Sequence, residues 1–179
     1  MNKKAIKLAA VAVIATFSLS ACGSTAKPTP SPSATKNPYG AGFKVANPAD
    51  SEVVLTIKGA TEVNFTMGQL KALATKEITI NEPFVKKVQK FNVILMKDLF
   101  KGITVPPAAK LNTLALNDYA YANTANNFFT NKAYIAVKRD GTDIPMDQGG
   151  PIRIVFADDS AYATNVDAWN WSLRTIEIK

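Results

Sequence analysis

Gly149-Gly150-Pro151-Ile152-Arg153-Ile154-Val155-Phe156 is the stretch that decides the fold expected for this chain. Paired glycines and a proline are typical of a turn, and the apolar side chains that alternate after them predict a core strand. Upstream, alternating apolar residues at 133–137 predict another strand with one inward face, and Asp140-Gly141 is typical of a tight hairpin turn. This part of the chain is therefore expected to consist of strands.

Further strands are expected on both sides of this stretch. Apolar residues at every second position predict them at 52–58, 63–65, 76–80, 111–117 and 171–178. A further, exposed strand is expected at 86–91. In the segment 171–178, Trp171 and Leu173 share one parity while Ile176 and Ile178 share the other. That change of parity predicts a bulge or bend before the final strand.

Short helices are expected between some of these strands. Thr66 and Gln69 have the spacing of a capping box, which predicts a helix with Met67, Leu70 and Leu73 on its apolar side. A second helix is predicted from after Asn92 to about Gly102, and a helical turn at 124–130. Six or seven strands with two or three short helices make an α+β fold with a mixed sheet.

Composition excludes several kinds of chemistry. The chain has no histidine, and its only cysteine is Cys22. Ser-His-Asp and Cys-His catalysis and zinc sites built from histidine and cysteine are therefore excluded in their usual forms. From Ser51 onward, 15 basic residues stand against 13 acidic ones, which is not the basic excess expected of a nucleic-acid-binding protein.

The N-terminus has the pattern of a bacterial lipoprotein. Lys3, Lys4 and Lys7 precede an apolar run at 8–19, which is the layout of a secretory signal. The run is too short for a transmembrane helix, which needs about 20 apolar residues. Leu19-Ser20-Ala21-Cys22 resembles a lipobox, which implies a signal peptide at 1–21, cleavage before Cys22 and lipidation of Cys22 by acyl chains such as palmitate. The alternative is an ordinary secretory signal with a chance cysteine.

Residues 22–50 are predicted to be a tether between this anchor and a domain at 51–179. The segment contains five prolines among serine, threonine, alanine, lysine and glycine, with few apolar residues to pack. A flexible coil of this length spans roughly 30 Å on average. The expected location is therefore extracytoplasmic, with the domain held off the membrane by a lipid anchor and with no nucleic-acid partner.

The domain contains an ordered set of stretches known from one family. They are Phe65-Thr66-Met67-Gly68-Gln69-Leu70-Lys71-Ala72-Leu73, the pair Asp118-Tyr119, Asp140-Gly141 followed by 149–156, and the tail 171–178. In this order and spacing they resemble the molybdopterin-binding oxidoreductase domain of sulfite-oxidase type. The resemblance implies a mixed sheet with a barrel-like core and short helices around it, and a pterin cofactor in a cleft at the loop ends of the sheet.

The resemblance also implies where a metal ligand would stand. In the family a cysteine thiolate binds molybdenum from a loop that corresponds to 80–84 here, and Ile80-Asn81-Glu82-Pro83-Phe84 contains no cysteine. A thiolate is the soft ligand that suits this metal. Small stand-alone domains without the cysteine also resemble this chain. We therefore expect no bound cofactor, with molybdopterin as the alternative that the family suggests.

Five residues are candidates for binding a pterin-like or other small ligand. Asn81 and Glu82 stand in the loop of the family's metal ligand, where a carboxylate acts as hard ligand or general base; the alternative is ordinary loop polarity. Asp118 and Tyr119 offer an acceptor and a donor at a strand end, where a turn is equally natural. Arg153 has the planar donors that suit a phosphate, or it is the outward residue of a half-exposed strand.

Two other groups of residues are further candidates for binding. Asp140, Asp143 and Asp147 lack the spacing of a calcium loop, so solvated acids at a hairpin turn are the better interpretation. The aromatic residues either line a pocket or pack in the core; they are Tyr119, Tyr121, Phe128, Phe129, Trp169 and Trp171.

Three functions follow as hypotheses. The first is a cell-surface lipoprotein whose oxidoreductase-like domain no longer holds molybdenum and acts as a ligand-binding or accessory module. The second is a small extracytoplasmic molybdopterin-dependent oxidoreductase that holds its cofactor through phosphate contacts. The third is a structural module that docks a protein partner, which the sequence does not name.

Overall fold

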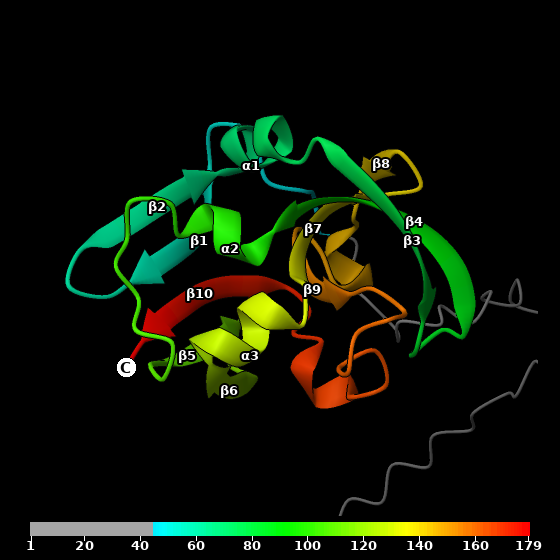
Figure 1. Cartoon of the computed structure of the whole chain (residues 1–179). Helices are drawn as coiled ribbons and strands as arrows, with labels where there is room; N and C mark the ends of the chain where they lie inside the picture. The colour runs from blue at the N-terminus through cyan, green and yellow to red at the C-terminus, as the bar shows by residue number, and fades with distance from the viewer. Residues whose placement is uncertain (1–44) are drawn as a thin grey trace, which may run out of the picture. The chain divides into compact units, whose positions relative to one another are not determined.

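The computed structural model describes residues 45–179, which form ten strands, three short α-helices and two 3₁₀ helices (Figure 1). The predicted signal peptide at 1–21, the predicted lipidation site Cys22 and the predicted tether as far as residue 44 lie outside the described residues. The α+β prediction is confirmed in its coarse form, because short helices accompany a structure that is mostly sheet.

The first sheet has the strand order β2-β1-β10-β5-β6. Its strands are β1 (Val53–Lys58), β2 (Glu62–Thr66), β5 (Lys110–Ala115), β6 (Ala120–Thr124) and β10 (Leu173–Ile178). β1 and β10 are parallel, and the other pairs are antiparallel. The register of β10 against β5 shifts between Leu173 and Thr175, which confirms the predicted bulge. β6 was not predicted, because its sequence lacks an alternating apolar pattern.

The second sheet has the strand order β3-β4-β7-β8, with β9 on the remaining side of β7. Its strands are β3 (Lys76–Glu82), β4 (Lys87–Leu95), β7 (Ala133–Arg139), β8 (Thr142–Asp143) and β9 (Arg153–Phe156). Asp140-Gly141 forms the β7–β8 hairpin turn as predicted, and both residues have positive φ. Neither sheet closes on itself through these pairings, so the barrel-like closure implied by the resemblance is not formed by the strand pairs of residues 45–179.

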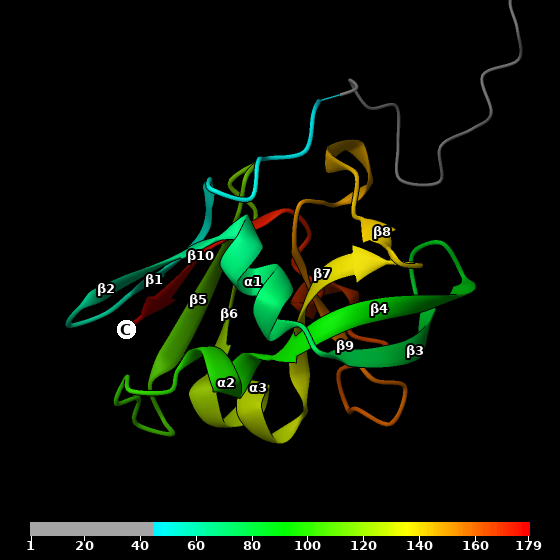
Figure 2. The same ribbon diagram turned by 90° about the horizontal axis from the view of Figure 1, so that it is seen from above.

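The three α-helices are short, and some of their bounds differ from the predicted ones. α1 (Met67–Leu73) has the predicted capping box, in which Thr66 and Gln69 each donate a backbone N–H to the other's side chain. Leu73, expected on the buried side of α1, is 49% exposed. α3 (Ala125–Thr130) agrees with the predicted helical turn. Figure 2 shows α2 (Met96–Leu99) beside α3.

The prediction of a helix from Asn92 to about Gly102 is wrong at both ends. Residues 92–95 continue β4, which lies between β3 and β7, and only Met96–Leu99 are helical. Val93 and Ile94 are buried in the sheet. Strand pairing on both sides of β4 outweighs the local helical pattern, as tertiary context commonly does.

The turn before β9 requires its glycines. Gly149 has φ +86°. A Cβ on Gly150 would stand 2.0 Å from the carbonyl oxygen of Ile144 and 2.7 Å from that of Pro145, both backbone atoms. No side chain fits that space without moving the backbone. After the turn, all four residues of β9 are buried, so this strand is covered on both faces.

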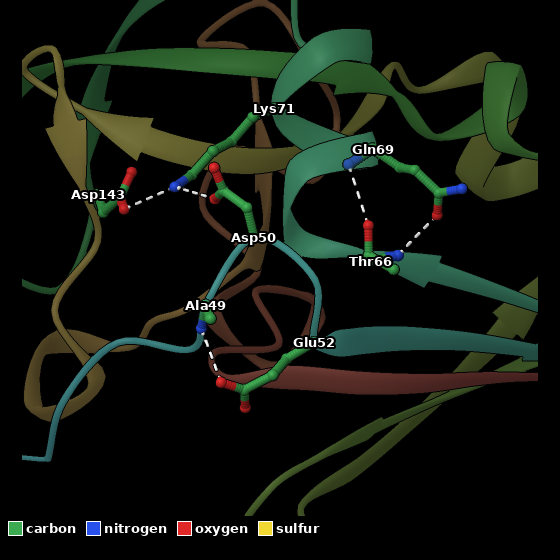
Figure 3. Close-up of polar contacts among 7 residues, drawn as sticks. All are labelled: Ala49, Asp50, Glu52, Thr66, Gln69, Lys71 and Asp143. Carbon is green, nitrogen blue, oxygen red and sulfur yellow. Dashed lines mark hydrogen bonds and ion pairs between the residues drawn. The ribbon is translucent and has the colours of Figure 1, made fainter.

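The end of the predicted tether is attached to the domain (Figure 3). Lys71 on α1 binds Asp50 and Asp143, each at 2.8 Å between Nζ and a carboxylate oxygen. The backbone N–H groups of Met67 and Gly68 donate to the carbonyls of Glu52 and Asp50. The hydrogen bonds from Asp143 and Asp50 raise the pKa of Lys71 above its usual 10.5. Residues 49–52 are therefore held at the start of α1.

We expect Gly150→Ala to destabilise the domain more than Gly141→Ala. Both substitutions add one methyl group. At Gly141 the added Cβ has open space around it, and the cost comes from the backbone φ of +80°, whereas at Gly150 the added Cβ meets backbone atoms. The expected losses in free energy of unfolding are about 1 kcal/mol for Gly141→Ala and about 3 kcal/mol or more for Gly150→Ala. Urea titration of the full chain measures both, and equal losses would contradict the steric argument.

We expect Lys71→Met to lower stability at neutral pH by about 1 kcal/mol, the upper end for such pairs. The pKa of Lys71 is raised in the folded state. The stabilisation of the fold by the charged Lys71 is therefore complete below the pKa of the unfolded chain and is lost as the pH rises through the pKa of the folded state. The difference in melting temperature between wild type and variant should therefore stay constant to about pH 10 and shrink above it. Lys90→Met, which removes the exposed pair with Glu77, is the matched control.

Candidate functional site

A buried ion pair joins the end of β3 to the start of β9. Arg153 Nη2 lies 3.2 Å from Glu82 Oε1, and both side chains are 0% exposed. The other carboxylate oxygen of Glu82 accepts the backbone N–H groups of Phe84 at 3.0 Å and Val85 at 2.7 Å. The carboxylate therefore fixes the conformation of the turn between β3 and β4 at the same time as it binds the guanidinium.

Two aromatic rings enclose the guanidinium of Arg153. The rings of Phe91 on β4 and Trp171 each have their centroid 4.9 Å from Arg153 Cζ. Such contacts favour a desolvated cation. Trp171 reaches this position because Gly149 has no side chain, since a Cβ there would stand 3.0 Å from the indole. The sequence stretch that sets the fold thus also places the ring above the arginine.

The β3–β4 turn and the segment 158–171 line two pockets, which we name together the turn–loop site. The polar pocket has a volume of about 460 Å³ and is lined by Asn81, Glu82, Pro83, Lys86, Asp158, Ala163 and Thr164. The aromatic pocket has a volume of about 220 Å³ and is lined by Phe84, Asn117, Tyr119, Val166, Asp167, Trp169 and Trp171. Glu82, Phe84 and Trp171 connect both pockets to the buried ion pair.

The polar pocket is held by a contact between strand and loop. Asn81 donates its backbone N–H to Asp158 Oδ1 at 2.9 Å and its side-chain amide to Asp158 Oδ2 at 2.6 Å. Both residues are exposed on their other sides. Lys86, with φ +54°, completes the turn and adds a cation to the lining. The pocket therefore offers an amide, a carboxylate and an ammonium group to a ligand.

The aromatic pocket has an exposed mouth. Phe84, Tyr119 and Val166 are 41–43% exposed, and the ring centroids of Phe84 and Trp171 are 4.5 Å apart. The hydroxyl of Tyr119 donates to the carbonyl of Asp167 at 2.9 Å. Burial, with the nearby Asp167 charge, raises the pKa of Tyr119, so the phenol is neutral at physiological pH. This pocket suits a flat apolar group with hydrogen-bonding edges.

The structure brings four of the five predicted residues to one place. Asn81 and Glu82 line the polar pocket, Tyr119 lines the aromatic pocket, and Arg153 binds Glu82 beneath them. Asp118 does not belong to this group, because it occupies the β5–β6 turn with φ +64° and its carboxylate binds Arg174. The interpretation of Arg153 as an outward residue of a half-exposed strand is wrong, since β9 is covered on both faces.

The expected aromatic group divides between pocket and core. Tyr119, Trp169 and Trp171 line the aromatic pocket, whereas Phe128 is buried in the core and Tyr121 and Phe129 pack against it. Sequence reasoning missed Phe84, Lys86 and Asp158. Phe84 is the last residue of the stretch 80–84 that was named for the missing cysteine, and Lys86 lies two residues beyond it, so both stand close to the predicted candidates Asn81 and Glu82. Nothing in the spacing of Asp158 indicates its contact with Asn81, which is 77 residues away in sequence.

The predicted hairpin acids have structural roles. Asp140 Oδ1 accepts the backbone N–H of Lys90, and Asp143 binds Lys71. Within residues 45–179, no three histidine, cysteine, aspartate or glutamate side chains gather as a metal site.

The predicted loop at 80–84 belongs to β3 as far as Glu82, and its residues do not fit a molybdenum-pterin group. The loop has no thiolate. Both oxygens of Glu82 already accept hydrogen bonds, and the Glu82 and Arg153 side chains have no exposed surface with which to bind a metal or a phosphate. A ligand at the turn–loop site would instead meet the amide, ammonium and aromatic groups that line the two pockets.

The chain matches no protein-family model and no curated protein sequence. None of the helices in residues 45–179 is long and apolar enough to cross a membrane.

We expect a double-mutant cycle to show that Glu82 and Arg153 act as a unit. Removing one partner of a buried pair leaves an uncompensated group and costs about 3–5 kcal/mol, whereas replacing both costs less than the sum. Urea titration of Glu82→Gln, Arg153→Met and the double variant should therefore give a coupling of about 2 kcal/mol. Lys90→Gln at the exposed pair with Glu77 should change little, and additive losses at Glu82 and Arg153 would contradict the pairing.

Proposed function

We propose that this protein is an extracytoplasmic lipoprotein whose domain binds a small ligand at the turn–loop site, as a binding or accessory module. The observation that carries the proposal is the division of the site into a buried ion pair and two open pockets. The charged groups best suited to catalysis or to phosphate binding, Glu82 and Arg153, are engaged with each other. The groups that face solvent are suited to recognition.

The two pockets favour one kind of ligand. Phe84, Tyr119 and Val166 provide an apolar mouth, and Asn81, Asp158 and Lys86 provide polar contacts on the same turn and loop. Ligand sites typically combine an apolar lining with a few polar groups that set orientation. We therefore expect a small, flat molecule that carries at least one polar substituent.

The location and the ancestry of the domain are part of the proposal. The lipobox at 19–22 supports a lipid anchor at Cys22, and the ordered stretches at 65–73, 118–119, 140–141, 149–156 and 171–178 support a relationship to molybdopterin-binding oxidoreductases of sulfite-oxidase type. The cysteine-free 80–84 loop supports a domain that binds without this metal. An accessory role at the cell surface is consistent with both features.

We expect the full chain, produced in a host that makes molybdopterin and purified from its membranes, to contain neither molybdenum nor pterin in stoichiometric amount. Metal analysis and fluorescence of the oxidised pterin measure this directly. One molybdenum per chain, lost on Arg153→Ala, would support the oxidoreductase alternative and overturn the binding module. A known molybdoenzyme from the same cells is the positive control.

We expect the two tryptophans to report ligand binding, because Trp169 and Trp171 are the only tryptophans and both line the aromatic pocket. In the full chain labelled with 5-fluorotryptophan, benzoate and benzamide at millimolar concentration should shift both ¹⁹F signals. Phe84→Ala should reduce the shift several-fold, whereas Leu73→Ala, which changes another exposed apolar residue outside the site, should not. Unchanged signals with both probes would contradict an aromatic ligand.

A further inference from the structure

A second groove lies apart from the turn–loop site, between α2, α3 and the segment 103–107. It has a volume of about 450 Å³. Its floor is apolar and includes Phe100, Ile103, Val105 and Phe129, of which the two phenylalanine rings pack with their centroids 5.3 Å apart. None of the residues of the turn–loop site lines it.

The rim of this groove is positively charged. Lys97 and Lys101 both line it, four residues apart, and both are exposed. Lys101 binds Asp98 at the surface, with 3.2 Å between Nζ and Oδ1. Lys97 has no ion pair among residues 45–179, and no aspartate or glutamate of this part of the chain lines the groove. An anion at the rim would therefore meet two cations and no lining acid.

We propose that this groove binds the carboxylate end of one free long-chain fatty acid. The chain lies on Phe100, Ile103, Val105 and Phe129, where burial of methylene groups drives binding. The carboxylate lies between Lys97 and Lys101, where ionised acceptors form the stronger class of hydrogen bond. A groove of this volume suits one small ligand, so a single chain fits better than a phospholipid with two chains.

The proposal excludes the acyl chains expected on Cys22 as the occupant. Those chains are joined through thioether, ester and amide bonds and have no free carboxylate to bind the lysines. The two occupants can therefore be distinguished by changing the charge of the rim, because only the binding of a free fatty acid depends on Lys97 and Lys101. The proposal is also independent of the ligand at the turn–loop site.

Photo-crosslinking in membranes that contain the full chain tests this proposal. A palmitic acid analogue with a diazirine in its chain is added, activated by light, and mapped by mass spectrometry of peptides. We expect labelling of the peptides that contain 100–105 and 126–130. Labelling should fall at least about fivefold in Lys97→Glu/Lys101→Glu and by a smaller factor in Lys97→Gln/Lys101→Gln.

The controls separate this site from general membrane contact. Lys58→Glu/Lys87→Glu reverses two other exposed lysines and should leave the labelling unchanged. Labelling of the groove that does not depend on Lys97 and Lys101, or labelling spread evenly over the domain, would overturn the proposal. Labelling by a diazirine phospholipid but not by the fatty acid would also overturn it and would assign the groove to a membrane lipid.

Discussion

The buried ion pair between Glu82 and Arg153 is the interaction on which the second sheet and the turn–loop site both depend. It joins β3 to β9 across a sheet in which β4 and β7 lie between them. Desolvating two charges is costly, and further contacts to each charge reduce that cost. Here two backbone N–H groups and the rings of Phe91 and Trp171 surround the pair. The pair therefore tolerates little movement of the elements around it.

This rigidity explains how the surface pockets keep their form. Glu82 holds the backbone of the β3–β4 turn, and that turn presents Phe84 to one pocket and Lys86 to the other. Trp171 contacts Arg153 on one side and lines the aromatic pocket with Phe84 on the other. A site on loops thus takes its precision from a charge pair in the core, in the manner of binding sites that are preorganised by the residues beneath them.

The sequence predicted most elements that depend on local pattern and failed where distant segments decide. The capping box of α1, the Asp140-Gly141 turn and the bulge in β10 follow from neighbouring residues, and all three are confirmed. The extension of β4 through 92–95 depends on β3 and β7, which no local pattern reveals. Likewise, Asn81, Glu82, Arg153 and Tyr119 were found as candidates, but the partnership of Glu82 with Arg153 spans 71 positions and was not predicted.

The attachment of residues 49–52 to α1 has a mechanical consequence. Any tension applied to the chain ahead of residue 45 enters the domain at Asp50, where Lys71 and the N–H of Gly68 hold it. These contacts precede β1 along the chain, and β1 is an inner strand bonded to β2 on one side and β10 on the other. The ion pairs of Lys71 with Asp50 and Asp143 are thus a point at which a pulling force on the N-terminal segment can be borne outside the central sheet.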